Sequence, residues 1–159
     1  MRAYRHISPL RDSLSQEGSI KYGGRWNKKE TFGALYFALL KPTLKAEVKR
    51  RMEITGLTER MYFPRKIAQV IIRISKLVDF RNPDIRKEWG LELLELRSDD
   101  LKPCQRIAQR IRKAGFEGII YPARTGIGEN VTIFKDRLEN LSFIKVEKEW
   151  IVSTLKDVD

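Results

Sequence analysis

The chain has 159 residues, a length that fits one domain with a sizeable hydrophobic core. Its 32 lysines and arginines exceed its 21 aspartates and glutamates by 11, which favours an acidic partner: nucleic acid, a phosphorylated metabolite, an acidic protein or an anionic membrane surface. With one histidine, His6, and one cysteine, Cys104, the chain can form neither an internal disulfide nor a zinc site of about four nitrogen and sulfur ligands.

The hydropathy pattern argues against membrane insertion and export. No apolar run approaches the ~20 residues of a membrane-spanning helix. Residues 1–6 are not followed by an apolar core of signal-peptide length. We therefore expect a soluble, cytoplasmic protein that binds no metal.

The first third of the chain predicts a strand, a long loop, an apolar segment and a helix. Residues 3–7 favour a short strand, and the serines and glycines of residues 8–24 are typical of a surface loop. An apolar run over residues 35–40 ends before Pro42, after which Thr43 is expected to cap a helix. The apolar face of this helix repeats at steps of four and consists of Leu44, Val48 and Met52.

The remainder of the chain predicts strands and helices in irregular order. The expected strands are residues 67–74, with 77–80 beside or beyond them, then 118–121, 131–134 and a last strand near 143–152. A short helix is expected near residues 83–93. A second helix, capped by Asp99 or Asp100 and stopped at Gly115, would bury Cys104, Ile107, Ala108 and Ile111. We therefore predict one α+β domain over residues 1–159.

Chemistry-bearing residues gather in a short N-terminal stretch. The sequence Gly23-Gly24-Arg25-Trp26-Asn27 is followed by Tyr36 and Glu47. Glycines let the backbone approach a ligand, and an arginine fork matches the paired oxygens of phosphate or carboxylate. Glu47 precedes the apolar Val48 by one position, which places it at the border of the buried face and able to look into a cleft. The pattern suggests an anionic small molecule beside a reacting centre.

Each of these residues also has a purely structural interpretation, and the residues alone leave both open. Trp26 would anchor its loop in the core, and Tyr36 would pack within its apolar run. Glu47 has Arg50 and Arg51 three and four positions later, so an exposed helix ion pair worth about 0.3 to 0.5 kcal/mol is a second expectation.

Other patterns carry less information. The glycines of Gly126-x-Gly128 lack the third glycine of a dinucleotide fingerprint and precede a strand, and no Walker A sequence is present. Residues 41–66 are locally basic, which suits a phosphate backbone as well as it suits a solvated helix face. A basic nucleic-acid-binding module therefore stays open as an alternative, although no recognised nucleic-acid motif accompanies the charge.

Taken in order, a series of short motifs resembles the RES domain family over nearly the whole chain. The motifs are Tyr4-Arg5, Gly23-Gly24-Arg25-Trp26-Asn27, Leu35-Tyr36-Phe37-Ala38, Glu47, Ala114-Gly115-Phe116-Glu117-Gly118-Ile119-Ile120-Tyr121-Pro122 and Asn130-Val131-Thr132-Ile133-Phe134. The resemblance implies a single domain with a fold similar to that of ADP-ribosyltransferases, with central β-sheets and flanking helices. It also implies a toxin of a bacterial toxin–antitoxin pair.

The resemblance further implies an activity on NAD, which would be a substrate: cleavage of the nicotinamide–ribose bond by hydrolysis or phosphorolysis, or transfer of ADP-ribose to a protein. Glu47, Arg25 and Tyr36 would be the catalytic residues, with Glu47 stabilising the positive charge that develops on the ribose. The other expected NAD contacts come from Arg5, which would help Arg25 hold the pyrophosphate, and from Trp26, Arg124, Thr125 and Asn130.

One position departs from the family pattern. The family has a serine in a Pro-Ser segment, but here Pro122 is followed by Ala123, Arg124 and Thr125, with no serine before Asn130. Either Thr125 or a backbone amide takes the place of the serine, or the chain is a relative with reduced or no enzymatic activity. In the inactive case its function would be to bind its partner. That partner would be an antitoxin that covers the site, commonly with a helix-turn-helix DNA-binding part; this chain shows no such element itself.

Overall fold

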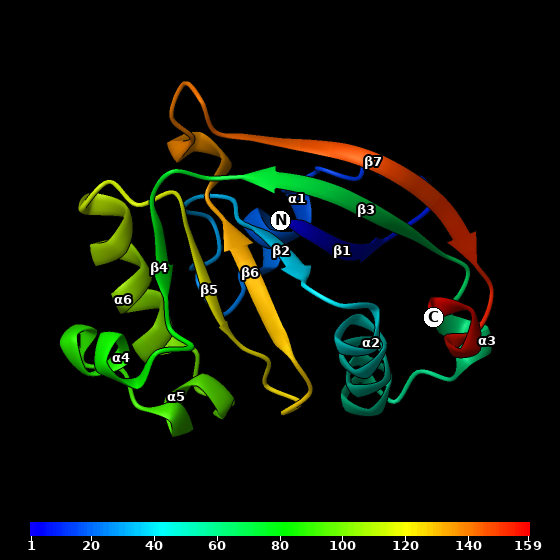
Figure 1. The fold of residues 1–159 in the computed structure, drawn as a ribbon. Helices are drawn as coiled ribbons and strands as arrows, with labels where there is room; N and C mark the ends of the chain where they lie inside the picture. Colours follow the sequence, from blue (N-terminus) through cyan, green and yellow to red (C-terminus); the bar gives the residue numbers. More distant parts are fainter.

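A single seven-stranded sheet organises the protein, as seen in a computed structural model that describes all residues 1–159 (Figure 1). The strand order is β4-β5-β6-β2-β1-β3-β7, and every neighbouring pair is antiparallel except β4 and β5. The strands are β1 (Arg2–Ile7), β2 (Leu35–Ala38), β3 (Arg65–Arg73), β4 (Leu77–Asp79), β5 (Gly118–Pro122), β6 (Glu129–Ile133) and β7 (Phe143–Val152). The expected α+β class is confirmed.

The helices fall into two groups around this sheet. Figure 1 shows α4, α5 and α6 gathered beside β4 and β5, while α2 lies apart from them, toward the other end of the molecule. The helices are α1 (Glu17–Tyr22), α2 (Lys41–Thr55), α3 (Glu59–Tyr62), α4 (Pro83–Trp89), α5 (Leu93–Arg97) and α6 (Lys102–Lys113), with 3₁₀ turns at Lys135–Arg137 and Leu155–Val158. The turn between β5 and β6 lies between the two groups, since its residues contact both α2 and the segment after α5.

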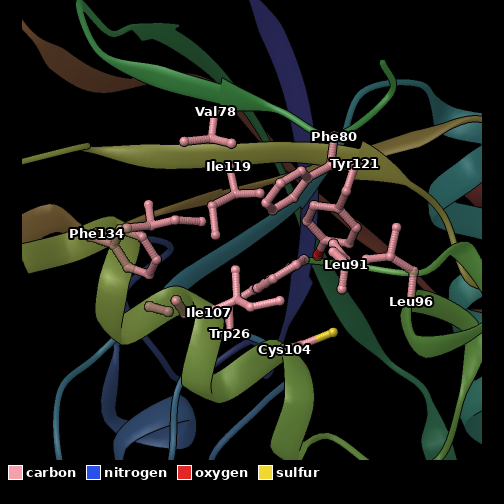
Figure 2. Close-up of a cluster of buried hydrophobic side chains, with 13 residues drawn as sticks. Trp26, Val78, Phe80, Leu91, Leu96, Cys104, Ile107, Ile119, Tyr121 and Phe134 are labelled. Carbon is pink, nitrogen blue, oxygen red and sulfur yellow. The ribbon is translucent and has the colours of Figure 1, made fainter. Parts of the chain in front are cut away.

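Each group of helices closes its own part of the core. Helix α6 buries Cys104, Ile107, Ala108 and Ile111, as its apolar spacing predicts, in a cluster around Trp26 and Phe80 (Figure 2). Helix α2 buries Leu44, Val48 and Met52 against the other end of the sheet. A fully buried aliphatic side chain contributes about 1.5 to 3 kcal/mol, so these stripes fix both groups on the sheet.

Several boundaries differ from the sequence-based expectations. Helix α2 begins at Lys41, because Pro42 suits the first turn of a helix; Thr43 therefore lies inside the helix, and its expected role as the cap is wrong. Residues 8–24 are not all loop, since they include α1. Helix α3 was not anticipated. The single helix expected near residues 83–93 is two helices, separated by Gly90 in the left-handed conformation.

Glu117, from one of the family-like motifs, has a structural role. Its side chain is completely buried, and its carboxylate accepts hydrogen bonds from the backbone N–H groups of Ser75 (2.8 Å), Lys76 (2.8 Å) and Glu139 (2.6 Å). Burial acts to raise its pKa, but these N–H donors outweigh burial and hold the pKa below its ordinary value. One buried carboxylate thus joins the turn before β4 to the segment before β7.

His6 gives the fold a specific sensitivity to acid. Burial, reinforced by the positive charges of Arg65 and Arg51, lowers the pKa of His6 to about 3, and its Nδ1 lies 3.3 Å from Arg65 Nη2. Because the unfolded chain protonates its histidine near pH 6.5, the folded state loses stability as pH falls below that value and suffers no penalty above it.

We therefore expect His6 to cost about 2 kcal/mol of unfolding free energy between pH 7 and pH 5. Denaturant unfolding of the native chain and of His6→Asn at both values measures this contribution. Asparagine keeps an acceptor near the Nδ1 position but does not titrate, so the variant should lose correspondingly less stability than the native chain. Equal losses in the two proteins would contradict the prediction.

Candidate active site

The loop of residues 23–27 is fastened on three sides. Its ends meet in a bridge, in which Gly24 N donates to Asn27 O at 2.8 Å. The buried Asn27 side chain donates to Ser19 O (2.7 Å) and Phe32 O (3.0 Å), and Gln105 of α6 donates to Gly24 O (2.9 Å). The loop is therefore held in one position before any ligand arrives.

Tyr36 of β2 provides a further fastening, and it explains one glycine. The Tyr36 hydroxyl accepts from Trp26 N at 2.9 Å and donates to Asn27 Oδ1 at 2.7 Å. A Cβ atom placed on Gly24 would lie only 2.5 Å from that hydroxyl. The close approach that the glycine permits is thus to Tyr36, within the protein.

Replacing Gly24 by alanine should therefore destabilise the protein by about 1 to 3 kcal/mol, since the added methyl group must displace the Tyr36 ring or the loop. Gly18→Ala is the matched control, because a Cβ there meets nothing within 4 Å and the position lies in α1. Thermal unfolding of both variants makes the comparison. Equal melting temperatures would show that the loop does not depend on this contact.

Arg25 reaches from the loop to the end of α5. Its Nη1 donates to Glu95 O at 3.1 Å and its Nη2 to Ser98 O at 3.0 Å. Nη1 also lies 3.8 Å from the Cys104 sulfur, whose pKa is raised by burial despite this guanidinium. Cys104 is thus a buried thiol, and the guanidinium of Arg25 is oriented by two backbone carbonyls.

Trp26 is fully buried and anchors the loop in the core. Its ring stacks on Phe80 at 5.7 Å between centroids and meets Tyr121 edge-on at 5.2 Å (Figure 2). Aromatic pairs of this geometry add about 0.5 to 1.5 kcal/mol each to the area that they bury. Trp26 therefore holds the loop in place and presents no surface to a ligand.

Glu47 faces the sheet and not its arginine neighbours. Asn130, in β6, donates its side-chain amide to Glu47 Oε1 at 3.1 Å. Neither Arg50 nor Arg51 comes within 4 Å of the Glu47 carboxylate, so the expected helix ion pair is absent; Arg50 approaches Asp99 instead. The Glu47 carboxylate is therefore held by a neutral amide donor and not by a cation.

Strand register places the remaining groups on one face of the sheet. Asn130 pairs with Ala38 of β2 and with Tyr121 of β5, and Thr132 pairs with Tyr36. Directly paired residues point to the same side, so Tyr36, Tyr121 and Asn130 line the face that Glu47 approaches. Tyr121 and Thr132 join their hydroxyls at 3.1 Å.

Electrostatics connect Glu47 and Arg25 across this face. Burial raises the pKa of Tyr121 to about 12, with Glu47 acting to raise it further and Arg25 to lower it. Burial likewise raises the pKa of Tyr36 far above its ordinary value, and Arg25 again opposes the rise. Both tyrosines are therefore neutral hydroxyls at any working pH, suited to hydrogen bonding and unsuited to act as bases.

The turn between β5 and β6 brings Arg124 and Thr125 to the edge of the same region. Arg124 Nη2 donates to Asp99 Oδ1 at 2.5 Å. Thr125 accepts from Ile127 N at 3.3 Å and lines, with Arg50 of α2, a cavity of about 530 Å³. The threonine hydroxyl thus lies in the segment where the family has its serine, but it faces the outer side of α2.

Arg5 is not brought to this group. It pairs with Ala68 in the sheet, while Tyr4 pairs with Ala38, so its side chain lies on the opposite face from Tyr36 and Asn130. Its guanidinium donates to Ser13 O (3.0 Å) and Ser15 O (2.9 Å), and burial lowers its pKa to about 10. Its contacts are those of a residue that supports the loop before α1.

Sequence reasoning did not identify Tyr121, Gln105 and Asp99 as parts of the site. Tyr121 lies within one of the family-like motifs, but nothing in the pattern placed its hydroxyl beside Thr132.

No group of three or more histidine, cysteine, aspartate or glutamate side chains is arranged to hold a metal ion. No helix has both the length and the apolar character needed to span a membrane.

Comparison with known proteins places this geometry in context. A model described as the RES domain matches residues 2–153. The NAD(+) phosphorylases MbcT of Mycobacterium tuberculosis (strains CDC 1551 and H37Rv) and of Mycobacterium bovis are each 30% identical to the chain over 136 residues, which cover 84% of this chain and 73% of each relative.

A solved structure agrees at the level of the fold. The crystal structure of the M. tuberculosis MbcT-MbcA toxin-antitoxin complex contains a chain that superposes with a TM-score of 0.88. The match covers 99% of this chain and 86% of that chain, at 24% sequence identity. The seven-stranded sheet and its helices therefore have a close counterpart.

Proposed function

The chain belongs to the RES domain family, and on that premise we propose that it is the toxin of a toxin–antitoxin pair and cleaves NAD at the nicotinamide–ribose bond, with inorganic phosphate as acceptor. The choice of phosphate follows the MbcT relatives, which are named as NAD(+) phosphorylases. The observation that carries the proposal is the position of Glu47, held by Asn130 over the face that Tyr36 and Tyr121 line.

The reaction needs a negative charge at one point. As the bond between ribose and nicotinamide breaks, its electron pair returns to the nicotinamide ring, and positive charge develops on the ribose. A carboxylate next to the sugar stabilises that charge, more strongly in a partly water-excluded site than in bulk water. We assign this role to Glu47, whose orientation the Asn130 amide fixes.

Arg25 is assigned to the anionic part of NAD. A guanidinium attracts the pyrophosphate, and two of its donors are already directed by the carbonyls of Glu95 and Ser98, so little ordering is needed on binding. Tyr36 and the backbone of residues 23–27 would form the adjoining wall, with Trp26 fixing that wall from behind. Arg124 and Asn130 would contact the opposite end of the substrate, whereas Thr125 is left out because it faces the outer side of α2. Arg5 is left out, because it lies on the other face of the sheet.

Steady-state release of nicotinamide from NAD tests the proposal. Purified protein should release nicotinamide at a rate that rises and saturates with phosphate concentration at constant ionic strength. Release without phosphate dependence would indicate hydrolysis, and radiolabel from NAD appearing on protein would indicate transfer of ADP-ribose. If no NAD is consumed with any of these acceptors, the proposed function fails.

The partner proposal has its own test. We propose that an antitoxin binds over the site, with a helix-turn-helix DNA-binding part of its own, and that it is encoded beside this chain. Co-purification of the neighbouring gene's product with this chain, together with loss of nicotinamide release in the complex, is the expected result. A neighbouring product that neither binds nor inhibits would contradict it.

A further inference from the structure

Two arginines from separate elements converge on a single carboxylate. Arg50 comes from α2 and Arg124 from the turn between β5 and β6, and their Nη2 atoms lie 3.8 Å and 2.5 Å from the same oxygen, Oδ1 of Asp99. The arginine side chains are only 23% and 22% exposed, whereas the Asp99 side chain is 90% exposed. The two guanidinium groups are thus largely buried, whereas the carboxylate between them belongs to an exposed side chain in the loop after α5.

The charges at this point do not balance. Asp99 has a pKa below its ordinary value, chiefly because of its hydrogen bond with Arg124, with Arg50 and Arg25 acting in the same direction. One carboxylate therefore lies between two guanidinium groups, and the charge of a third, Arg25, acts on it from further away. An ion pair whose anion is so exposed contributes about 1 kcal/mol or less, so a dianion with several oxygens can compete for the two forks.

The position relates the pair to the reaction. Arg50 follows Glu47 by three residues on α2, so the two side chains start about one turn apart, with Glu47 directed at Asn130 and Arg50 at Asp99. Arg124 lies in the turn that leads to Asn130, the partner of Glu47. A cavity of about 530 Å³ is lined by Arg50 and Thr125, which leaves room beside the Arg50 side chain.

We propose that Arg50 and Arg124 form the binding site of the attacking inorganic phosphate, and that Asp99 occupies this site until phosphate replaces it. The assignment rests on the proposed function. A phosphate oxygen forms the bond to ribose C1 while the bond to the nicotinamide nitrogen breaks and its electron pair neutralises the pyridinium ring. The products are nicotinamide and ADP-ribose 1-phosphate, so no further reactant is required.

Asp99 then has a definite role in the reaction. In the free protein it neutralises part of the charge on the two arginines and ties the loop after α5 to the turn between β5 and β6. When phosphate binds, this anion of higher charge displaces the carboxylate into water. The free-energy cost of that displacement is small, because the Asp99 side chain is already exposed. Removing the carboxylate should therefore strengthen phosphate binding, whereas removing Arg50 should weaken it.

Calorimetric titration of inorganic phosphate tests this without turnover. The measurement uses the Glu47→Gln protein without NAD, at fixed ionic strength, alone and combined with Asp99→Asn, Arg50→Gln or Arg51→Gln. We expect phosphate affinity to rise about tenfold with Asp99→Asn and to fall about tenfold with Arg50→Gln, since each step of that size is about 1.4 kcal/mol. Arg51→Gln removes the same charge from the adjacent, exposed position of α2 and is the matched control.

The outcomes separate this site from the proposed function. Equal weakening by Arg50→Gln and Arg51→Gln would reduce the effect to net charge and overturn the site, as would unchanged or weaker binding with Asp99→Asn. Because Asp99 is exposed, its variant is not expected to unfold. Phosphate binding with the expected order in a protein that never cleaves NAD would overturn the function but leave the site. If NAD cleavage depends on phosphate but the Arg50→Gln and Arg51→Gln proteins have the same KM for phosphate, the proposed function stands and the phosphate site is overturned.

Discussion

Glu47→Gln is expected to lower kcat for nicotinamide release by about a thousandfold, equivalent to about 4 kcal/mol of transition-state stabilisation. The substitution removes the negative charge that faces the developing cation. It preserves shape, and the glutamine oxygen still accepts from Asn130 as Glu47 Oε1 does at 3.1 Å. The thermal midpoint should therefore shift little. Initial rates at saturating NAD and phosphate, with thermal unfolding alongside, measure both effects.

Glu53→Gln is the matched control for this prediction. Glu53 lies on the same helix, is exposed, and pairs only with Lys49 at 4.0 Å. It should retain the native kcat. A Glu47→Gln protein with more than about a tenth of the native kcat would not fit a carboxylate that stabilises the ribose cation.

Arg25→Ala is expected to weaken NAD binding by about a hundredfold and to cost about 2 to 3 kcal/mol of unfolding free energy. The effect on binding follows from the loss of the cation assigned to the pyrophosphate. The effect on folding follows from the two hydrogen bonds to Glu95 O and Ser98 O, which join the loop of residues 23–27 to the end of α5. Calorimetry with NAD, on the Glu47→Gln background to prevent turnover, measures the affinity.

Arg97→Ala controls for charge alone. Arg97 is exposed at the end of α5 and takes part in no ion pair. Its variant should bind NAD with an affinity within about twofold of the parent, because the charge of an exposed side chain that makes no ion pair is screened by salt. A native NAD dissociation constant for Arg25→Ala would contradict the placement of the pyrophosphate beside Arg25.

Local patterns predicted much of the fold because local physics sets those parts of it. The apolar spacing from Cys104 to Ile111 was enough to orient α6, and the β-branched run of residues 67–74 coincides closely with β3 at Arg65–Arg73. The start of α2 was missed, because a residue with good capping chemistry, Thr43, stands just after a proline that itself suits the first turn.

In the candidate site, too, local patterns predicted some features, whereas others depend on contacts between distant segments. The helical position of Glu47, at the border of the buried face, could be derived from its neighbour Val48, and the structure places its carboxylate against Asn130. The competing ion pair with Arg50 could not be excluded from spacing, since the choice depends on Asp99, 49 positions further along the chain and brought near only by the fold. The two faces of a strand can be told apart in sequence, but which face meets α2 cannot. That is why Arg5 could not be separated from the other candidates.

The basic residues of the chain differ in how many acidic partners they have. Three lysines of the segment 41–66 have acidic partners from elsewhere in the fold or from the same helix: Lys45 with Asp159, Lys49 with Glu53 and Lys66 with Glu149. Arg50 and Arg124, in contrast, share one exposed carboxylate. Clustered charge that is short of counter-charge fits a small, doubly charged anion.

The product formed from NAD in the presence of phosphate is the most direct test of the account. Purified protein, NAD and inorganic phosphate should yield nicotinamide and ADP-ribose 1-phosphate, recognised by a new phosphomonoester signal in the ³¹P spectrum and by a mass that includes one phosphate. The Glu47→Gln protein should yield neither at a comparable rate. Recovery of intact NAD from the native protein, or of free ADP-ribose at every phosphate concentration, would contradict the claim that Glu47 stabilises a ribose cation that phosphate captures.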